Sequence, residues 1–128
     1  MVQKSASSQT SSREIEPRLL AFLHETVDTF VKWDLIRFFH DNPHVMDTAE
    51  NIARYTGRDV VTVEAELVGL SEKDVLRIKE VSGRYIFQLS ADAEIRELIN
   101  DFLLACDDRQ FRVQAINEVI NGMRQEGY

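Results

Sequence analysis

The chain has 128 residues, 44% of them hydrophobic and 29% charged, which suits one globular domain with its own core. No apolar run reaches the ~18 residues of a membrane span, and residues 1–12 lack the apolar stretch of a secretory signal, so we expect a cytoplasmic protein without membrane contact. The formal net charge of −7 excludes a uniformly basic nucleic-acid binder and leaves only a local basic patch for that role.

The N-terminal third is predicted to be a tail followed by helix. Residues 1–12 are rich in serine and poor in apolar side chains, which predicts disorder. Pro17 fits the first position of a helix, and apolar residues then recur at helical spacing as far as Phe39. Residues 17–41 form either one long helix or two helices. We favour two, with Asp28 capping the second.

Two short helices are predicted next. The first runs from Asp47 to Tyr55, with Asp47 as its N-cap and Glu50 three residues later, as in a capping box. Gly57 provides a left-handed position after it. The second helix runs from Asp59 to Lys73, with Asp59 as its N-cap and an apolar face at helical spacing.

A β-hairpin is predicted after the second short helix. Asp74 stands where a left-handed residue is expected, and residues 75–81 and 84–89 alternate in the manner of strands. Ser82-Gly83 between them is typical of a tight turn. The chain is then predicted to return to helix.

The C-terminal region is predicted to form two amphipathic helices. Ser90 is the expected N-cap of the first, and Asp107-Asp108 separates it from the second, which starts near Arg109. Either this pair packs back on the domain, or it joins a second copy. We favour a homodimer, with contact residues Phe111, Ile116, Val119, Ile120 and Met123.

The predicted elements follow one another in a recognisable order over residues 28–90. The supporting motifs are Ile52-Ala53, Thr62-Val63, Leu67, Leu70, Asp74-Val75-Leu76 and Val81-Ser82-Gly83-Arg84-Tyr85. This series resembles the winged helix-turn-helix family of bacterial transcription regulators, as in ArsR-like and MarR-like proteins. The resemblance implies a mainly α fold with a small β-hairpin and extra N- and C-terminal helices. We therefore expect one winged-helix domain over residues 13–128, with its core at 28–90 and a C-terminal helical pair at 91–125.

The resemblance implies a dimeric regulator that binds double-stranded DNA through the second short helix and the hairpin. The contact candidates are Arg54, Arg58, Thr62, Glu64, Glu66, Arg77, Lys79, Arg84 and Tyr85. The charged candidates on the second short helix are acidic, and those on the hairpin are basic. From Arg58 to Asp74 there are two basic residues (Arg58 and Lys73) against five acidic ones (Asp59, Glu64, Glu66, Glu72 and Asp74), whereas the hairpin is basic. The alternative is a protein-interaction module or adaptor that does not bind DNA.

Catalytic and metal chemistry find little support in the sequence. His40 and His44 are separated by Pro43, so they do not share a helical face for a metal ion. Phosphate-cradle and nucleophile-elbow motifs do not occur. The single cysteine, Cys106, is expected to be a buried helix residue in a reducing compartment. We expect no enzyme activity, no cofactor and no metal.

Overall fold

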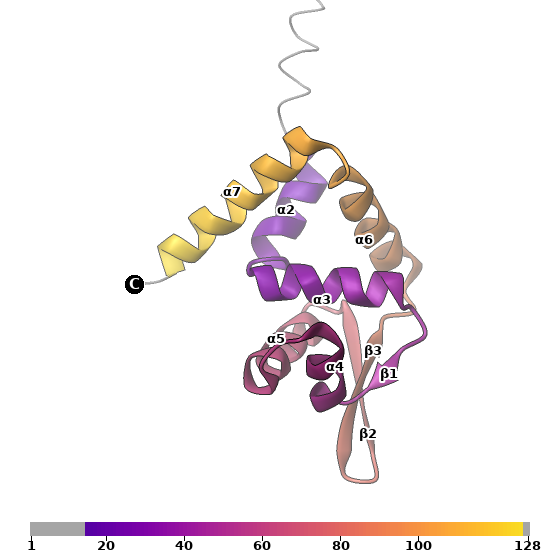
Figure 1. Cartoon of the computed structure of the whole chain (residues 1–128). Helices are drawn as coiled ribbons and strands as arrows, with labels where there is room; N and C mark the ends of the chain where they lie inside the picture. Colours follow the sequence, from indigo (N-terminus) through magenta and orange to yellow (C-terminus); the bar gives the residue numbers. More distant parts are fainter. Residues whose placement is uncertain (1–14, 127–128) are drawn as a thin grey trace, which may run out of the picture.

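The computed structural model describes residues 15–126, and this part of the chain is mostly helical with a small three-stranded antiparallel sheet. Figure 1 shows α3 crossing the middle of the molecule, with α2, α6 and α7 on one side and α4, α5 and the sheet on the other. We call these the terminal-helix half and the sheet half. In order, the elements are α2 (Pro17–Glu25), α3 (Phe30–Asp41), β1 (Met46–Asp47), α4 (Ala49–Thr56), α5 (Val60–Glu72), β2 (Leu76–Val81), β3 (Arg84–Leu89), α6 (Ala93–Ala105) and α7 (Arg109–Glu126).

The first predicted helical stretch is two helices, as favoured from the sequence. Pro17 occupies the start of α2, where its missing N–H costs nothing. The expected cap at Asp28 is wrong, because Thr29 caps α3 by accepting a hydrogen bond from the Lys32 backbone N–H at 3.1 Å. Asp28 instead accepts from the Lys32 side chain. The predicted disordered tail lies outside the described residues.

The two short helices form where they were predicted, with one cap displaced. Thr48, and not Asp47, caps α4 by accepting from the Asn51 backbone N–H at 3.3 Å. Gly57 ends α4 with a φ of +68°, a conformation that glycine adopts without steric cost. Asp59 caps α5 as predicted, accepting from the Thr62 backbone N–H at 3.0 Å.

The predicted hairpin is confirmed, and it belongs to a sheet with a third strand that was not expected. β2 pairs with β3 antiparallel from Leu76↔Leu89 to Val81↔Arg84, and Ser82 (φ +53°) and Gly83 (φ +79°) form the turn between them. Two successive positive φ angles match the twist of a two-residue hairpin. The short β1 pairs with the other edge of β3, so the strand order is β1-β3-β2.

The last two helices are joined by the acidic break that the sequence predicted. The expected cap at Ser90 is wrong, because Asp92 caps α6 and Ser90 supports the turn before it by accepting from the Asp92 backbone N–H. Asp108 accepts from the Phe111 backbone N–H at 2.9 Å at the start of α7. Within residues 15–126, no helix has both the length and the apolar character needed to cross a membrane.

Helix α3 supplies side chains to both halves of the core. On the terminal-helix side, the Trp33 ring lies 5.3 Å from that of Phe102 on α6, centroid to centroid. Phe102 also contacts Phe22 of α2 and Phe111 of α7, so aromatic rings join four helices at one point. On its other side α3 packs on α4, α5 and β3. One apolar core therefore runs through both halves.

An ion cluster fixes α5 on α3. The Lys32 side chain is 14% exposed and its Nζ lies 2.8 Å from Asp28 Oδ1 and 3.4 Å from Glu66 Oε1. Burial lowers the pKa of the Lys32 ammonium, but the hydrogen bond and charge of Asp28 and the charge of Glu66 outweigh it, so the pKa is raised. Gly69 lies against this side chain, and a Cβ there would be 2.8 Å from Lys32 Cε.

Candidate functional site

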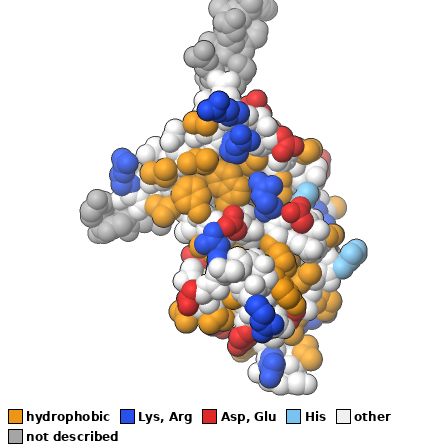
Figure 2. Space-filling view, in the orientation of Figure 1, with side chains coloured by type: hydrophobic (Ala, Val, Ile, Leu, Met, Phe, Trp, Pro, Cys, Tyr) orange, Lys and Arg blue, Asp and Glu red, His pale blue; other side chains and the backbone are white. Residues whose placement is uncertain are grey.

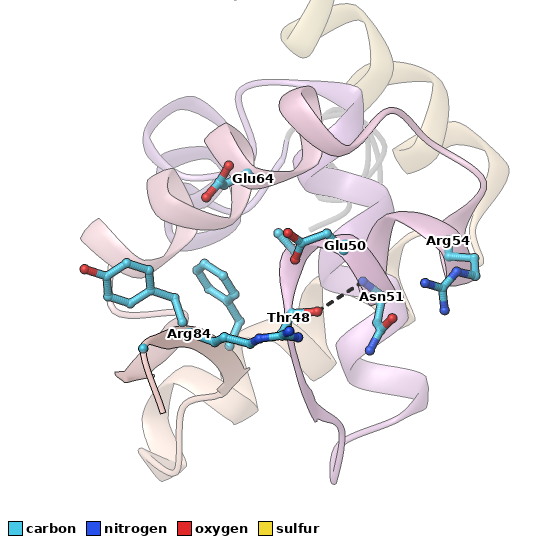
Figure 3. Close-up of a pocket in the computed structure, with 10 residues that line it drawn as sticks. Thr48, Glu50, Asn51, Arg54, Glu64 and Arg84 are labelled. Atoms are coloured by element: carbon cyan, nitrogen blue, oxygen red, sulfur yellow. Dashed lines mark hydrogen bonds between the residues drawn. The ribbon is translucent and has the colours of Figure 1, made fainter. Parts of the chain in front are cut away.

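The start of α4, the outer side of α5 and the tip of the hairpin surround an open pocket of about 550 Å³. Figure 3 shows Glu64 of α5 and Glu50 of α4 in the upper part of this pocket, with Arg84 reaching from the hairpin toward Thr48 and Asn51. Its lining consists of Thr48, Ala49, Glu50, Asn51, Arg54, Glu64, Gly83, Arg84, Tyr85 and Phe87. The pocket therefore combines both signs of charge with two aromatic rings.

The start of α4 is held in place by Asp47. Its Oδ1 accepts from the Asn51 side chain at 2.7 Å and from the Thr48 backbone at 2.8 Å, and its Oδ2 accepts from the Tyr55 hydroxyl at 2.8 Å. Burial raises the pKa of the Asp47 carboxyl, but these hydrogen bonds outweigh it and the pKa is lowered. The carboxylate that seemed to be a cap thus orders the wall of the pocket.

The outer face of α5 is apolar and acidic. Val63, Leu67 and Leu70 face the core, which leaves the opposite side of the helix to solvent. That side presents Val61, Ala65 and Val68, and Val61 is 72% exposed. Between Val60 and Glu72 there is no lysine or arginine. This is an unusual surface for a helix that would lie among DNA phosphates.

The four contact candidates predicted on and just before α5 lie in four different environments. Arg58 forms an ion pair with Asp34 of α3, and the Thr62 hydroxyl donates to Asp59. Glu66 was predicted as a contact residue together with Glu64, but its side chain is only 20% exposed and pairs with Lys32. Helical phase explains the difference, since residue 66 lies between the buried positions 63 and 70 on the helix surface, three residues after one and four before the other. Of these four residues, only Glu64 lines the pocket, together with the candidates Arg54, Arg84 and Tyr85 from α4 and the hairpin.

The basic residues of the hairpin lie along its strands. Arg77 and Lys79 stand opposite Gln88 and Ile86 in the β2–β3 register, so they share one face of the ribbon. Both are exposed, as is Arg84 near the turn. Within residues 15–126, none of these three side chains forms an ion pair with an acidic side chain. The positive charge of Arg77 and Lys79 is therefore directed to solvent, and that of Arg84 to the open pocket.

The predicted dimer residues divide between the core and the surface. Val119 is 2% exposed within the single chain, and the Phe111 ring packs on Phe102. Ile120 and Met123 are exposed. Figure 2 shows hydrophobic side chains gathered on the face between α7 and α3, with lysine and arginine side chains around them. We call this face the α3–α7 notch.

The α3–α7 notch contains residues that the sequence did not single out. A pocket of about 240 Å³ there is lined by Ile116, one of the predicted dimer residues, and by Phe30, Trp33, Asp34, Arg37 and Arg112, which the sequence did not single out. Phe30 and Trp33 stack with ring centroids 6.1 Å apart. Phe30 is the first residue of α3 and is 36% exposed. Its place at the helix start was the one sequence signal that this apolar side chain could lie outside the buried face.

Other reactive groups are isolated from these surfaces. Among residues 15–126, no three histidine, cysteine, aspartate or glutamate side chains are grouped so that they could hold a metal ion. Cys106 is buried at the end of α6, and burial raises the pKa of its thiol to about 11. At neutral pH the thiol is therefore protonated and weakly nucleophilic.

Comparison with known proteins gives a distant likeness in structure and none in sequence. No model of a protein family matches the sequence, and no curated protein matches it. Among solved structures, the chain is similar to a possible transcriptional regulator from Methanosarcina mazei Go1, with a TM-score of 0.47 and 20% sequence identity. The likeness covers 78% of this chain and 84% of that one. We therefore infer function from this chain's own surface.

Proposed function

We propose that the chain is a winged helix-turn-helix domain that regulates transcription by binding duplex DNA, mainly through its hairpin. The order α3, β1, α4, α5, β2, β3 supports the fold, since α4 and α5 meet at a glycine turn and the hairpin follows as the wing. We assign no catalytic step to it. The observation that carries DNA binding is the exposed, unpaired basic charge of Arg77, Lys79 and Arg84.

The charge distribution determines how DNA is contacted. Acidic and apolar side chains on α5 disfavour deep insertion into the major groove, because like charges repel near the phosphates. The hairpin therefore leads, and its contacts go to the phosphate backbone. About three phosphate contacts give a slope of about −3 for log K against log salt, and twice that for a dimer. Sequence discrimination is accordingly weak.

Fluorescence anisotropy with a labelled duplex at low salt tests this proposal. Arg77→Ala/Lys79→Ala should weaken binding at least ~10-fold and flatten the salt slope. Arg109→Ala/Arg124→Ala removes the same charge from α7 and is the matched control, so it should leave affinity nearly unchanged. Absence of binding by the unaltered chain at low salt refutes the proposal.

We also propose that two copies associate through the α3–α7 notch. Ile116 of α7 lines the pocket of this notch, and Ile120 and Met123 follow it at helical spacing. Ile120, Met123 and Phe30 of α3 expose apolar surface that a single chain leaves uncovered. A two-fold dimer would present two hairpins to one duplex. Ile120→Glu should shift the mass measured by light scattering toward the monomer, whereas Leu104→Glu, at a more exposed apolar site on α6, should not. A wild-type mass equal to one chain contradicts the dimer.

A further inference from the structure

The surface of α5 that a DNA-reading helix would use has the wrong chemistry for that task. Val61, Ala65 and Val68 follow one another at helical spacing and are all solvent-exposed, and Glu72 continues the same stripe. A duplex offers mainly phosphates and polar base edges to such a helix, and its one apolar group, the thymine methyl, is too small to cover a stripe that includes a valine 72% exposed. A protein side chain would cover it favourably, since burial of apolar surface is the main gain in most protein associations.

The pocket beside this stripe adds charge to the apolar surface. Glu64 on the flank of the stripe and Glu50 on α4 both line it, and neither forms an ion pair within residues 15–126. Tyr85 and Phe87 line the same pocket, and the Tyr85 side chain is exposed. Two carboxylates near aromatic rings provide a favourable environment for an ammonium or guanidinium group. Figure 3 shows Arg54 on the far side of Asn51 from Glu64, and Arg84 running below Glu50 toward Thr48.

We propose that the stripe and the pocket together dock a segment of a partner protein that carries a lysine or arginine beside apolar residues. The basic side chain enters between Glu50 and Glu64, and the apolar residues lie on Val61 and Val68. A small ligand would fill the pocket but leave the stripe in water, which favours a polypeptide. Arg77 and Lys79 do not line this pocket, whereas Arg84 belongs both to the pocket and to the proposed DNA surface, so the two surfaces meet at Arg84.

Selection from a displayed library of short random peptides tests the proposal on the full chain. The peptides that are enriched should combine a lysine or arginine with apolar residues, and their affinity is then measured with synthetic copies. Glu50→Gln/Glu64→Gln should weaken binding ~10-fold, because it removes both charge partners at a partly desolvated site. Val61→Asp should abolish binding without unfolding the chain, since this side chain contributes little to the core.

Matched variants separate this surface from general acidity and from DNA binding. Glu94→Gln/Glu97→Gln removes two exposed charges from α6 and should leave the peptide affinity unchanged. Arg77→Ala/Lys79→Ala should weaken DNA binding only. The proposal is overturned if no peptide is enriched, if the enriched peptides are acidic, or if they bind the Val61→Asp variant as tightly. It is also overturned if Val61→Asp abolishes binding to duplex DNA, which would assign the surface to nucleic acid.

Discussion

Replacing Gly69 with alanine places a methyl group against the Lys32 side chain. The new Cβ would lie 2.8 Å from Lys32 Cε and 3.0 Å from its Nζ, closer than side-chain carbons normally approach. The end of a lysine side chain is flexible, so it can move. It is only 14% exposed, however, and moving separates the ammonium from Asp28 and Glu66. Relief of the steric overlap therefore weakens the ion pairs of Lys32 with Asp28 and Glu66.

Two opposing effects set the magnitude. Glycine in a helix interior is less favourable than alanine by about 1 kcal/mol, so the substitution stabilises α5 by that amount when nothing else changes. Losing a charged hydrogen bond in a mostly buried position costs about 1.5–3 kcal/mol. We therefore expect Gly69→Ala to destabilise the natural chain by about 1 kcal/mol. In a Lys32→Ala background the methyl group meets open space, and the same change should stabilise by about 1 kcal/mol.

Urea unfolding of the four chains in this cycle, followed by circular dichroism, measures the difference. The expected coupling between Gly69 and Lys32 is about 2 kcal/mol, well above the scatter of additive pairs. The reversal of sign matters more than the size, since helix propensity alone predicts stabilisation in both backgrounds. Equal effects of Gly69→Ala with and without Lys32 would refute this reasoning.

Three further predictions concern the core and two titratable groups. Phe102→Ala should cost about 3–5 kcal/mol in urea unfolding, because the ring is fully buried among Phe22, Trp33 and Phe111; a cost below about 1 kcal/mol contradicts this packing. Because the pKa of Asp47 is lowered in the folded chain, its ionised carboxylate stabilises the fold above the unfolded-state pKa near ~4, and this stabilisation is lost as pH falls through the folded-state pKa. The difference in unfolding free energy between the natural chain and Asp47→Asn should therefore shrink in acid. A gap that is the same at neutral and acid pH speaks against it. Cys106 should react with a thiol reagent only after denaturant is added, because its pKa is raised to about 11, and fast labelling of the native chain would disprove this.

Turns could be predicted from the sequence because few residues adopt the required backbone. Gly57, Asp74 and the Ser82-Gly83 pair all have positive φ, as their residue types indicated. Helix caps were less certain. At three starts a second capping residue stands close by, and the structure uses Thr29, Thr48 and Asp92. Which of two neighbours caps a helix depends on the path of the preceding chain, and local sequence does not contain that path.

The surface was harder to predict than the elements. The pocket joins positions 48–54 of α4 with positions 83–87 of the hairpin, and only the folded chain brings these together. Strand β1 could not be predicted either, because two residues are too few to show a periodic pattern. Its pairing with β3 forms only in the folded chain. On α7 the apolar pattern was correct, but it could not tell Val119, which packs within the chain, from Ile120, which faces solvent. The dimer and DNA contacts remain predictions.

Helix α3 packs in both halves of the molecule, so the two halves are expected to unfold together. Trp33 packs in the core of the terminal-helix half, while other buried side chains of α3 pack in the core of the sheet half. Neither half retains a complete interior once α3 leaves, so separate melting of the two is unfavourable. We expect the amide hydrogens of α3 to exchange with deuterium last and only through whole-chain opening, while those of the hairpin tip exchange early by local fluctuation.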